Sequence, residues 1–151
     1  MRQRFPMILV RIIVGIVFIT EGILKFVRPA ELGVGRFAAI GFPFAGRLAP
    51  IVGGVEIGAG LAVLIGIFAG DAALLLLIVI LTALITTKVP ILLGHRLGPF
   101  GPPKLEPPFG VLSFLHEART DLSMTFCTLA ILIQEGFRIG RRRRWYQGNE
   151  R

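Results

Sequence analysis

Residues 48–93 read LAPIVGGVEIGAGLAVLIGIFAGDAALLLLIVILTALITTKVPILL and contain two long apolar stretches on either side of Gly70 and Asp71. A helix that spans a bilayer needs roughly 20 mostly apolar residues. The ranges 48–69 and 72–93 both meet that length. Because the connection between them is so short, the two helices are expected to form an antiparallel hairpin. This pair of membrane spans decides the fold class.

Two further apolar stretches flank the hairpin, at residues 7–26 and 115–137. The first differs from a cleaved secretory signal because Arg11 and Glu21 interrupt it and no small-x-small cleavage site follows. With 54% apolar residues and a mean hydropathy of +0.75, the 151-residue chain is expected to fold with lipid as its solvent. The sequence therefore predicts an all-α integral membrane protein, in which residues 1–137 form one antiparallel four-helix bundle.

The segments between the predicted spans are rich in glycine and proline. Between the first two spans, these residues alternate with apolar positions such as Leu32, Phe37 and Ile40, and a short helix in the membrane interface is expected there. Residues 94–110, GHRLGPFGPPKLEPPFG, contain five prolines among several glycines, which excludes regular structure. Two interpretations of this loop stay open, a plain external connector and a lid.

The basic residues give the predicted orientation. Although the formal net charge is +8, these residues flank apolar spans instead of covering a soluble face, so no nucleic-acid partner is expected. Arg2 and Arg4 precede the first span and a dense arginine run follows the last, so both termini are predicted to be cytoplasmic, in a bacterial inner membrane. The basic tail 138–151 is expected to contact anionic lipid through Arg141, Arg142, Arg143 and Arg144.

Cysteine and histidine usage argues against an intrinsic cofactor. Cys127 is the only cysteine, which excludes an intrachain disulfide and a CxxC redox pair. His95 falls in a loop and His116 at a helix start, a poor arrangement for paired haem ligands, and no nucleotide or iron–sulfur motif is present. The sequence predicts no metal site.

Glycines and charges share the faces of the first two spans. Arg11 and Lys25 lie on a glycine stripe of the first span, so both cations are expected to face other helices. Glu21 precedes Lys25 by four residues, and an i,i+4 ion pair is the default interpretation. Close helix packing is predicted at Gly15, Gly22, Gly53 and Gly60.

Glu56 shares a face of the second span with its glycines. An isolated carboxylate at this depth costs about 3 kcal/mol or more, so Glu56 is expected to have a cationic or protonated neighbour. A structural pair and a ligand or proton site are equally open interpretations.

If the spans alternate in direction, the outer half of the bundle collects polar residues from every span. The third span ends at Thr86, Thr87 and Lys88, and acidic residues open the fourth, where helix capping is the alternative explanation. Arg11 lies roughly 15 Å inward of Glu21 and is expected to serve the inner end separately. The candidate polar cluster consists of Arg11, Glu21, Lys25, Glu56, Lys88, His116, Glu117 and Asp121.

Three motifs resemble the DoxX family of small membrane proteins: RIIVGIVFITEGILKF at 11–26, VEIGAGLAVLIGI at 55–67 and HEARTDLSM at 116–124. The resemblance implies a four-helix membrane protein. Some relatives are linked to thiosulfate:quinone oxidation or to membrane-associated oxidoreductase assemblies, which implies quinone as a candidate ligand and a redox enzyme as a candidate partner. The resemblance to the family draws attention to nine residues of this chain: Arg11, Gly15, Gly22, Lys25, Glu56, Gly60, His116, Glu117 and Asp121.

Three functions remain open from the sequence. The first is a subunit or accessory protein of a membrane redox system, whose outer cluster binds a quinone headgroup or a small polar solute through donors such as His116 or Lys25. Any redox cofactor would then belong to the partner, and catalysis by this chain alone stays undecided. The second is a non-catalytic assembly module held by glycine faces and the arginine tail. The third is a small solute or proton transporter, which four helices per chain would support as a homo-oligomer.

Overall fold

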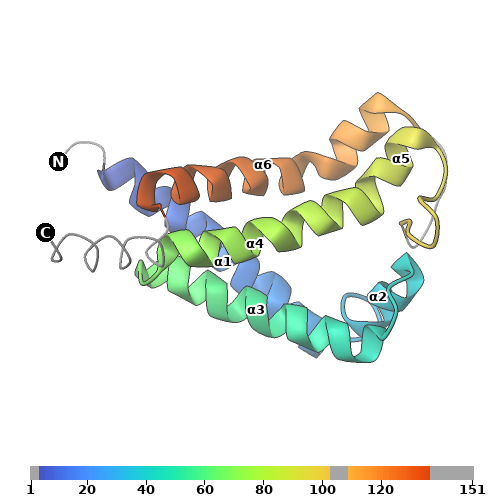
Figure 1. Ribbon diagram of the computed structural model, residues 1–151, viewed down its shortest axis with the longest axis horizontal. Coiled ribbons are helices and arrows are strands. Elements are labelled where there is room, and N and C mark those ends of the chain that lie inside the picture. Colours follow the sequence, from blue (N-terminus) through green and yellow to red (C-terminus); the bar gives the residue numbers. More distant parts are fainter. Residues whose placement is uncertain (1–3, 103–108, 137–151) are drawn as a thin grey trace, which may run out of the picture.

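The computed structural model describes residues 4–102 and 109–136, and the regular structure in these ranges is helical. Only one isolated β-bridge, between Leu97 and Phe100, interrupts this pattern there. Figure 1 shows the elements in chain order, which are α1 (Arg4–Val27), α2 (Val34–Ile40), α3 (Ala45–Ile65), α4 (Ala69–Ala83), the π-helical segment η1 (Leu84–Lys88), α5 (Val89–Leu93) and α6 (Val111–Glu135).

Three helical segments are long and apolar enough to cross a membrane: Pro6–Val27, Ala45–Ile65 and Ala69–Leu93. The segment α6 has the length of a span but is not among these three. Glu117 and Asp121 fall in its first half and lower its hydropathy. The apolar stretches of the sequence therefore identify three spans directly.

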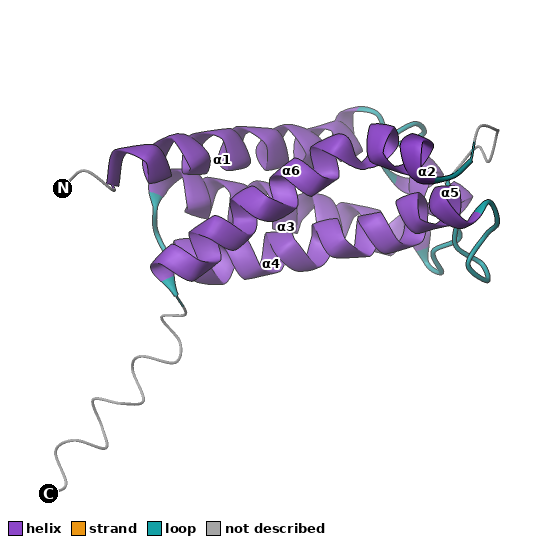
Figure 2. Cartoon of the chain, turned by 90° about the horizontal axis from the view of Figure 1, so that it is seen from above, coloured by secondary structure: helices purple, strands orange, loops and turns teal. Residues whose placement is uncertain are grey.

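The long helices pack side by side in a closed arrangement. The helix α3 lies between α1 and α4, α6 packs on α4, and α6 also contacts α1. The chain colours in Figure 1 show α1 leading away from the N-terminal end, α3 returning, α4 leading away again and α6 returning. Figure 2 shows α2 and α5 together at the far end. We call this the α2 end, and the opposite one the turn end.

The connection at the turn end differs from the prediction. Gly66 ends α3 in the left-handed conformation, with φ of +83°, and its N–H bonds to the carbonyls of Ala62 and Val63. A glycine adopts this backbone without the steric cost of a Cβ atom. The turn therefore falls at residues 66–68, whereas Gly70 and Asp71, where it was predicted, already belong to the first turn of α4.

Many large apolar side chains face outward as well as inward. Val14, Leu76 and Ile131 are completely buried between the helices. On the outside of α6, Phe126 and Ile133 are 70% and 81% exposed. Water would penalise large apolar side chains at such positions, and hydrocarbon chains would not. The surface suits a protein surrounded by lipid.

Three glycines allow the backbones of α1 and α3 to approach closely. A Cβ atom on Gly15 would lie 2.8 Å from the Cβ of Leu64, and one on Gly22 would lie 2.7 Å from the carbonyl oxygen of Gly53. Gly60 lies equally close to α1, where its own Cβ would meet Ile19 at 3.0 Å. Because a side chain would separate the two backbones at these points, the glycines fix the spacing of this helix pair.

The third span changes its winding before it ends. At η1 the α-helical pattern becomes π-helical, and the Val89 N–H bonds to the carbonyl of Leu84. Pro90, which follows, has no N–H to donate to the preceding turn. The hydroxyl of Thr87 donates to the carbonyl of Ala83 at 2.6 Å. Such wide turns are rare and frequently occur at functional sites.

Candidate functional site

A cavity of about 560 Å³ lies at the α2 end, between α1, α2, α3, α4, η1 and α6. Much of its wall is apolar and includes the rings of Phe18, Phe37 and Phe42. Polar side chains from all six elements also line it, namely Glu21, Lys25, Arg36, Glu56, Thr82, Thr86, Thr87, Lys88, Glu117, Thr120 and Asp121. Six of the eight residues of the predicted polar cluster are in this set, which leaves Arg11 and His116.

An ion pair between α1 and α3 closes one side of the cavity. The ammonium of Lys25 lies 2.6 Å from a carboxylate oxygen of Glu56, and their side chains are only 10% and 5% exposed. The cationic neighbour expected for Glu56 is therefore present. The predicted ion pair between Glu21 and Lys25 was wrong, because Lys25 reaches only the backbone carbonyl of Glu21, at 3.4 Å.

The close contact of α1 with α3 explains why Lys25 pairs with Glu56 and not with Glu21. Gly22 precedes Lys25 by three residues, Gly53 precedes Glu56 by three, and the two glycines meet. Because α1 and α3 run in opposite directions, Lys25 and Glu56 lie on opposite sides of this contact along the helix axes, and the long Lys25 side chain spans the offset to reach the buried carboxylate. A buried charge gains most from a partner that is itself withdrawn from water, which Glu21, an exposed residue, is not.

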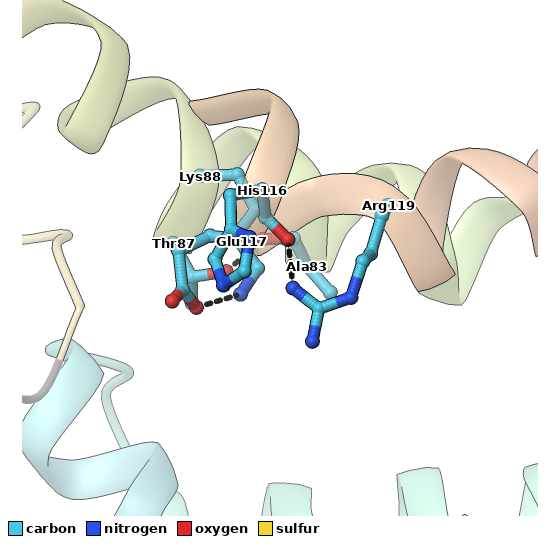
Figure 3. Close-up of polar contacts among 6 residues, drawn as sticks. All are labelled: Ala83, Thr87, Lys88, His116, Glu117 and Arg119. Atoms are coloured by element: carbon cyan, nitrogen blue, oxygen red, sulfur yellow. Dashed lines mark hydrogen bonds and ion pairs between the residues drawn. The ribbon is translucent and has the colours of Figure 1, made fainter. Parts of the chain in front are cut away.

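A second, looser pair joins η1 to α6. The ammonium of Lys88 lies 3.5 Å from the carboxylate of Glu117, and Figure 3 shows the two side chains pointing toward one another. The Glu117 side chain is 53% exposed. A pair of this length and exposure contributes little stability, on the order of 0–1 kcal/mol. Lys88 and Glu117 can therefore exchange partners more easily than Lys25 and Glu56.

Three charged groups on the cavity wall have no hydrogen-bond or ion-pair partner for their side chains among the described residues. They are Glu21 of α1, Arg36 of α2 and Asp121 of α6. The Asp121 carboxylate lies within electrostatic reach of Lys88 first, and then of its fellow unpaired groups Arg36 and Glu21. The three unpaired groups provide the cavity with a donor and two acceptors that are not committed to protein contacts.

Arg36 is the functional candidate that the sequence reasoning missed, because it was counted only as a basic residue of a connecting segment. The signal was nevertheless present. Arg36 and Ile40 are four residues apart on one face of α2, and both line the cavity together with Leu32, which precedes the helix. Thr82, Thr86 and Thr87 were seen as a polar helix end but were not included in the cluster.

His116 does not line the cavity. It is exposed at the start of α6, and its backbone carbonyl accepts a hydrogen bond from the guanidinium of Arg119, which turns back along the helix in Figure 3. The geometry therefore gives no support to His116 as a donor to a ligand in this cavity.

Arg11 lies at the turn end. Its guanidinium pairs with Glu135 near the end of α6, and a Cβ atom on Gly66 would lie 2.9 Å from one of its nitrogens. It thus connects α1, α6 and the turn after α3, separately from the cavity. Glu135 was not predicted, since it stands at the end of the fourth apolar stretch.

Among residues 4–102 and 109–136, no group of three or more histidine, cysteine, aspartate or glutamate side chains is placed to hold a metal ion. The half-buried thiol of Cys127 in α6 is free. The predicted lipid contacts at Arg141–Arg144 lie outside the described residues.

Comparison with known proteins relates the chain to a family of membrane proteins. The DoxX family profile matches residues 7–89, which run from α1 to the start of α5. The chain is 42% identical over 125 residues to the uncharacterized membrane protein Rv3486 of Mycobacterium tuberculosis, an alignment that covers 83% of this chain and 72% of the relative. No solved structure matches. With its membrane-spanning helices, the chain is an integral membrane protein that belongs to the DoxX family.

Proposed function

We propose that α6 is a fourth membrane span and that α1, α3, α4–α5 and α6 form an antiparallel transmembrane bundle. The outer face of α6 carries exposed Phe126 and Ile133, whereas two of its charged residues, Glu117 and Asp121, line the cavity. The exposed guanidinium of Arg119 bonds to the backbone carbonyl of His116. Charges inside a membrane usually face the protein interior or water, so the low hydropathy of α6 is compatible with a span. The basic ends of the sequence then lie together on the cytoplasmic side of a bacterial inner membrane.

We infer that the cavity binds a small ligand and that the chain works as a membrane subunit or accessory of a redox system, with a quinone headgroup as the ligand. The single observation that carries the binding proposal is the cavity of about 560 Å³ with apolar walls and three uncommitted charged groups. Small-molecule sites typically measure about 300–1,000 Å³ and combine apolar walls with a few oriented polar groups. The redox role itself is taken from the family resemblance.

The lining residues suit both forms of a quinone headgroup. Lys88 and Arg36 are donors that can bond to quinone carbonyl oxygens. Glu21 and Asp121 can accept hydrogen bonds from the hydroxyl groups of a quinol, or accept and pass on its protons. The electron-transferring group would belong to a partner protein, and this chain would bind the headgroup and hold protons beside it.

The test is purification of the full chain in nanodiscs with native lipid, followed by mass spectrometry of the bound small molecules. We expect a quinone at about one per chain in the wild type, and its loss in the double variant Arg36→Gln/Asp121→Asn. The matched control is Arg28→Gln/Glu31→Gln, which removes an exposed pair outside the cavity. Equal quinone content in the cavity variant and the control would contradict the proposal that quinone binds in this cavity.

A second candidate function, assembly with another membrane protein or a second copy, is favoured by a different observation. Gly54 and Gly58 are exposed on α3, four residues apart, and a Cβ atom on either would meet nothing within 4 Å. Small residues at this spacing let a further helix approach closely. A Gly58→Leu variant is expected to reduce association in mild detergent, measured by light scattering, while Ile133→Leu on the exposed face of α6 leaves it unchanged. Unaltered association would exclude this face.

The anionic-lipid contact of the tail also remains a proposal, based on the density of Arg141–Arg144. It predicts that replacing these four arginines lowers the content of anionic lipid that accompanies the purified chain, without changing the occupancy of the cavity.

A further inference from the structure

The positive and negative charges of the ionisable residues on the cavity wall do not cancel. Three of them are cationic, Lys25, Arg36 and Lys88, and four are anionic, Glu21, Glu56, Glu117 and Asp121. In their ordinary ionised forms they leave one negative charge in excess. A net charge inside a membrane protein is costly unless a counter-charge or water reaches it.

The excess resides on one side of the cavity. Lys25 neutralises Glu56, and Lys88 lies beside Glu117. Lys88 and Arg36 also act on Asp121, and together these two cations can offset only two of the carboxylates Glu117, Asp121 and Glu21, which leaves one negative charge in excess. The three carboxylates come from α1 and α6, so the unbalanced charge faces the space between the helices.

The walls around these groups favour a positive charge on an apolar body. Phe18, Phe37 and Phe42 contribute aromatic rings to the lining. The face of an aromatic ring attracts a cation, and most strongly where water is excluded. Aliphatic residues such as Val52 and Ile80 complete the wall and suit a hydrophobic substituent.

We propose that the ligand class of this cavity includes organic monocations with an apolar body, such as hydrophobic amines and quaternary ammonium or phosphonium compounds. Glu21 and Asp121 face the positive centre, Arg36 offsets the second carboxylate, and the phenylalanine rings hold the apolar substituents. The inference rests on the proposed role of the cavity as a ligand site and specifies the charge of its ligand, whether or not a quinone also binds there.

The experiment compares two probes that have the same size and shape and opposite charge, tetraphenylphosphonium and tetraphenylborate. The full chain is placed in nanodiscs of phosphatidylcholine, and binding is measured by equilibrium dialysis with empty nanodiscs subtracted. We expect saturable binding of tetraphenylphosphonium above the lipid background and no such binding of tetraphenylborate. Binding of both ions to the same extent, or of neither, would overturn the proposal.

Single substitutions then test which residues supply the negative charge that attracts the cation. Glu21→Gln and Asp121→Asn should each weaken tetraphenylphosphonium binding about tenfold or more, since each removes a unit charge at close range. Arg36→Gln should strengthen it, because the excess negative charge doubles. Asp121→Glu keeps the charge and should retain affinity, which separates an electrostatic effect from a folding defect. Glu31→Gln, outside the cavity, is the matched control. If both neutralising variants bound like the wild type, the assignment would fail.

The same samples separate this inference from the proposed function. Decylubiquinone binding without tetraphenylphosphonium binding would refute the cation site and leave the quinone site standing. Tetraphenylphosphonium binding without decylubiquinone binding would support the cation site and remove the quinone from the proposed function.

Discussion

Both ends of the molecule hold paired and unpaired charges: Lys25 pairs with Glu56 at the α2 end, and Asp71 at the turn end has a buried oxygen without a hydrogen bond to any described residue. The ends differ because the unpaired groups at the α2 end line a cavity. At the turn end, the helices are joined by the three-residue connection 66–68, and Arg11 and Glu135 meet directly across it. At the α2 end, the helices enclose a cavity of about 560 Å³, and Glu21, Arg36 and Asp121 have no partner among the described side chains. Groups that satisfy one another stabilise a fold, whereas groups without partners are available to a ligand. Paired charges are therefore structural at either end, and the unpaired charges on the cavity wall are the candidates for binding.

The largest expected effect comes from the one charge pair at the α2 end that is buried. Lys25→Ala leaves the carboxylate of Glu56 without its partner at 5% exposure, and should lower the free energy of unfolding by about 3–5 kcal/mol. Reversible unfolding in mixed detergent micelles measures this change. The double variant Lys25→Leu/Glu56→Leu removes both charges and should recover most of the loss. Equal stability of Lys25→Ala and the wild type would mean that this pair is not structural.

A smaller effect is expected at the connection of the turn end. Gly66→Ala introduces a Cβ atom at a φ of +83° and brings it within 2.9 Å of an Arg11 nitrogen. The backbone strain should cost about 1–2 kcal/mol, seen in the same unfolding measurement. Gly58→Ala is the control, because its Cβ would meet no atom within 4 Å. If the two alanine variants were equally stable, the turn would be less constrained than its geometry indicates.

The ion pair of the turn end should contribute less than the buried pair. The side chains of Arg11 and Glu135 are 20% and 33% exposed, so solvent screens part of their attraction. Glu135→Gln is therefore expected to lower the unfolding free energy by about 1 kcal/mol. Glu31→Gln, which breaks a fully exposed pair with Arg28, gives the lower reference. A loss from Glu135→Gln as large as that from Lys25→Ala would contradict this ranking.

The smallest effect on stability should come from an uncommitted cavity residue. Arg36→Gln removes a charge that has no partner among the described side chains and should change the unfolding free energy by less than about 0.5 kcal/mol. The same variant should alter ligand binding clearly. A large loss of stability together with unchanged binding would show that Arg36 is structural, and would remove the contrast between the two ends.

The fold was predictable to the extent that apolar length decides it. Three long helices fall where the sequence predicts spans, and a short helix, α2, lies in the segment where one was expected. The position of the turn was wrong because two glycines, Gly66 and Gly70, stand close together in an apolar run, and the sequence does not say which one takes a positive φ. The π-helical winding of η1 was not predicted either.

The candidate site was predictable in its members but less so in its pairs. Lys25 and Glu56 were both recognised as charges on glycine faces, yet the local spacing favoured Glu21 as the partner of Lys25. Local rules consider neighbours on one helix, and the true partner lies on another helix brought close by Gly22 and Gly53. Arg36 was missed because a residue in a short connecting helix gains its significance only from what that helix covers.

The π-helical segment η1 also determines how the residues at its end are rotated about the helix axis relative to α4. A wide turn accommodates one residue more than an α-helical turn, and each residue of an α-helix corresponds to a rotation of about 100°. If η1 tightened into an α-helix, the chain beyond it would rotate by about that angle relative to α4, and the Lys88 side chain, now in the cavity wall, would face another direction. The winding of five residues thus selects which side chains of the third span the cavity contains.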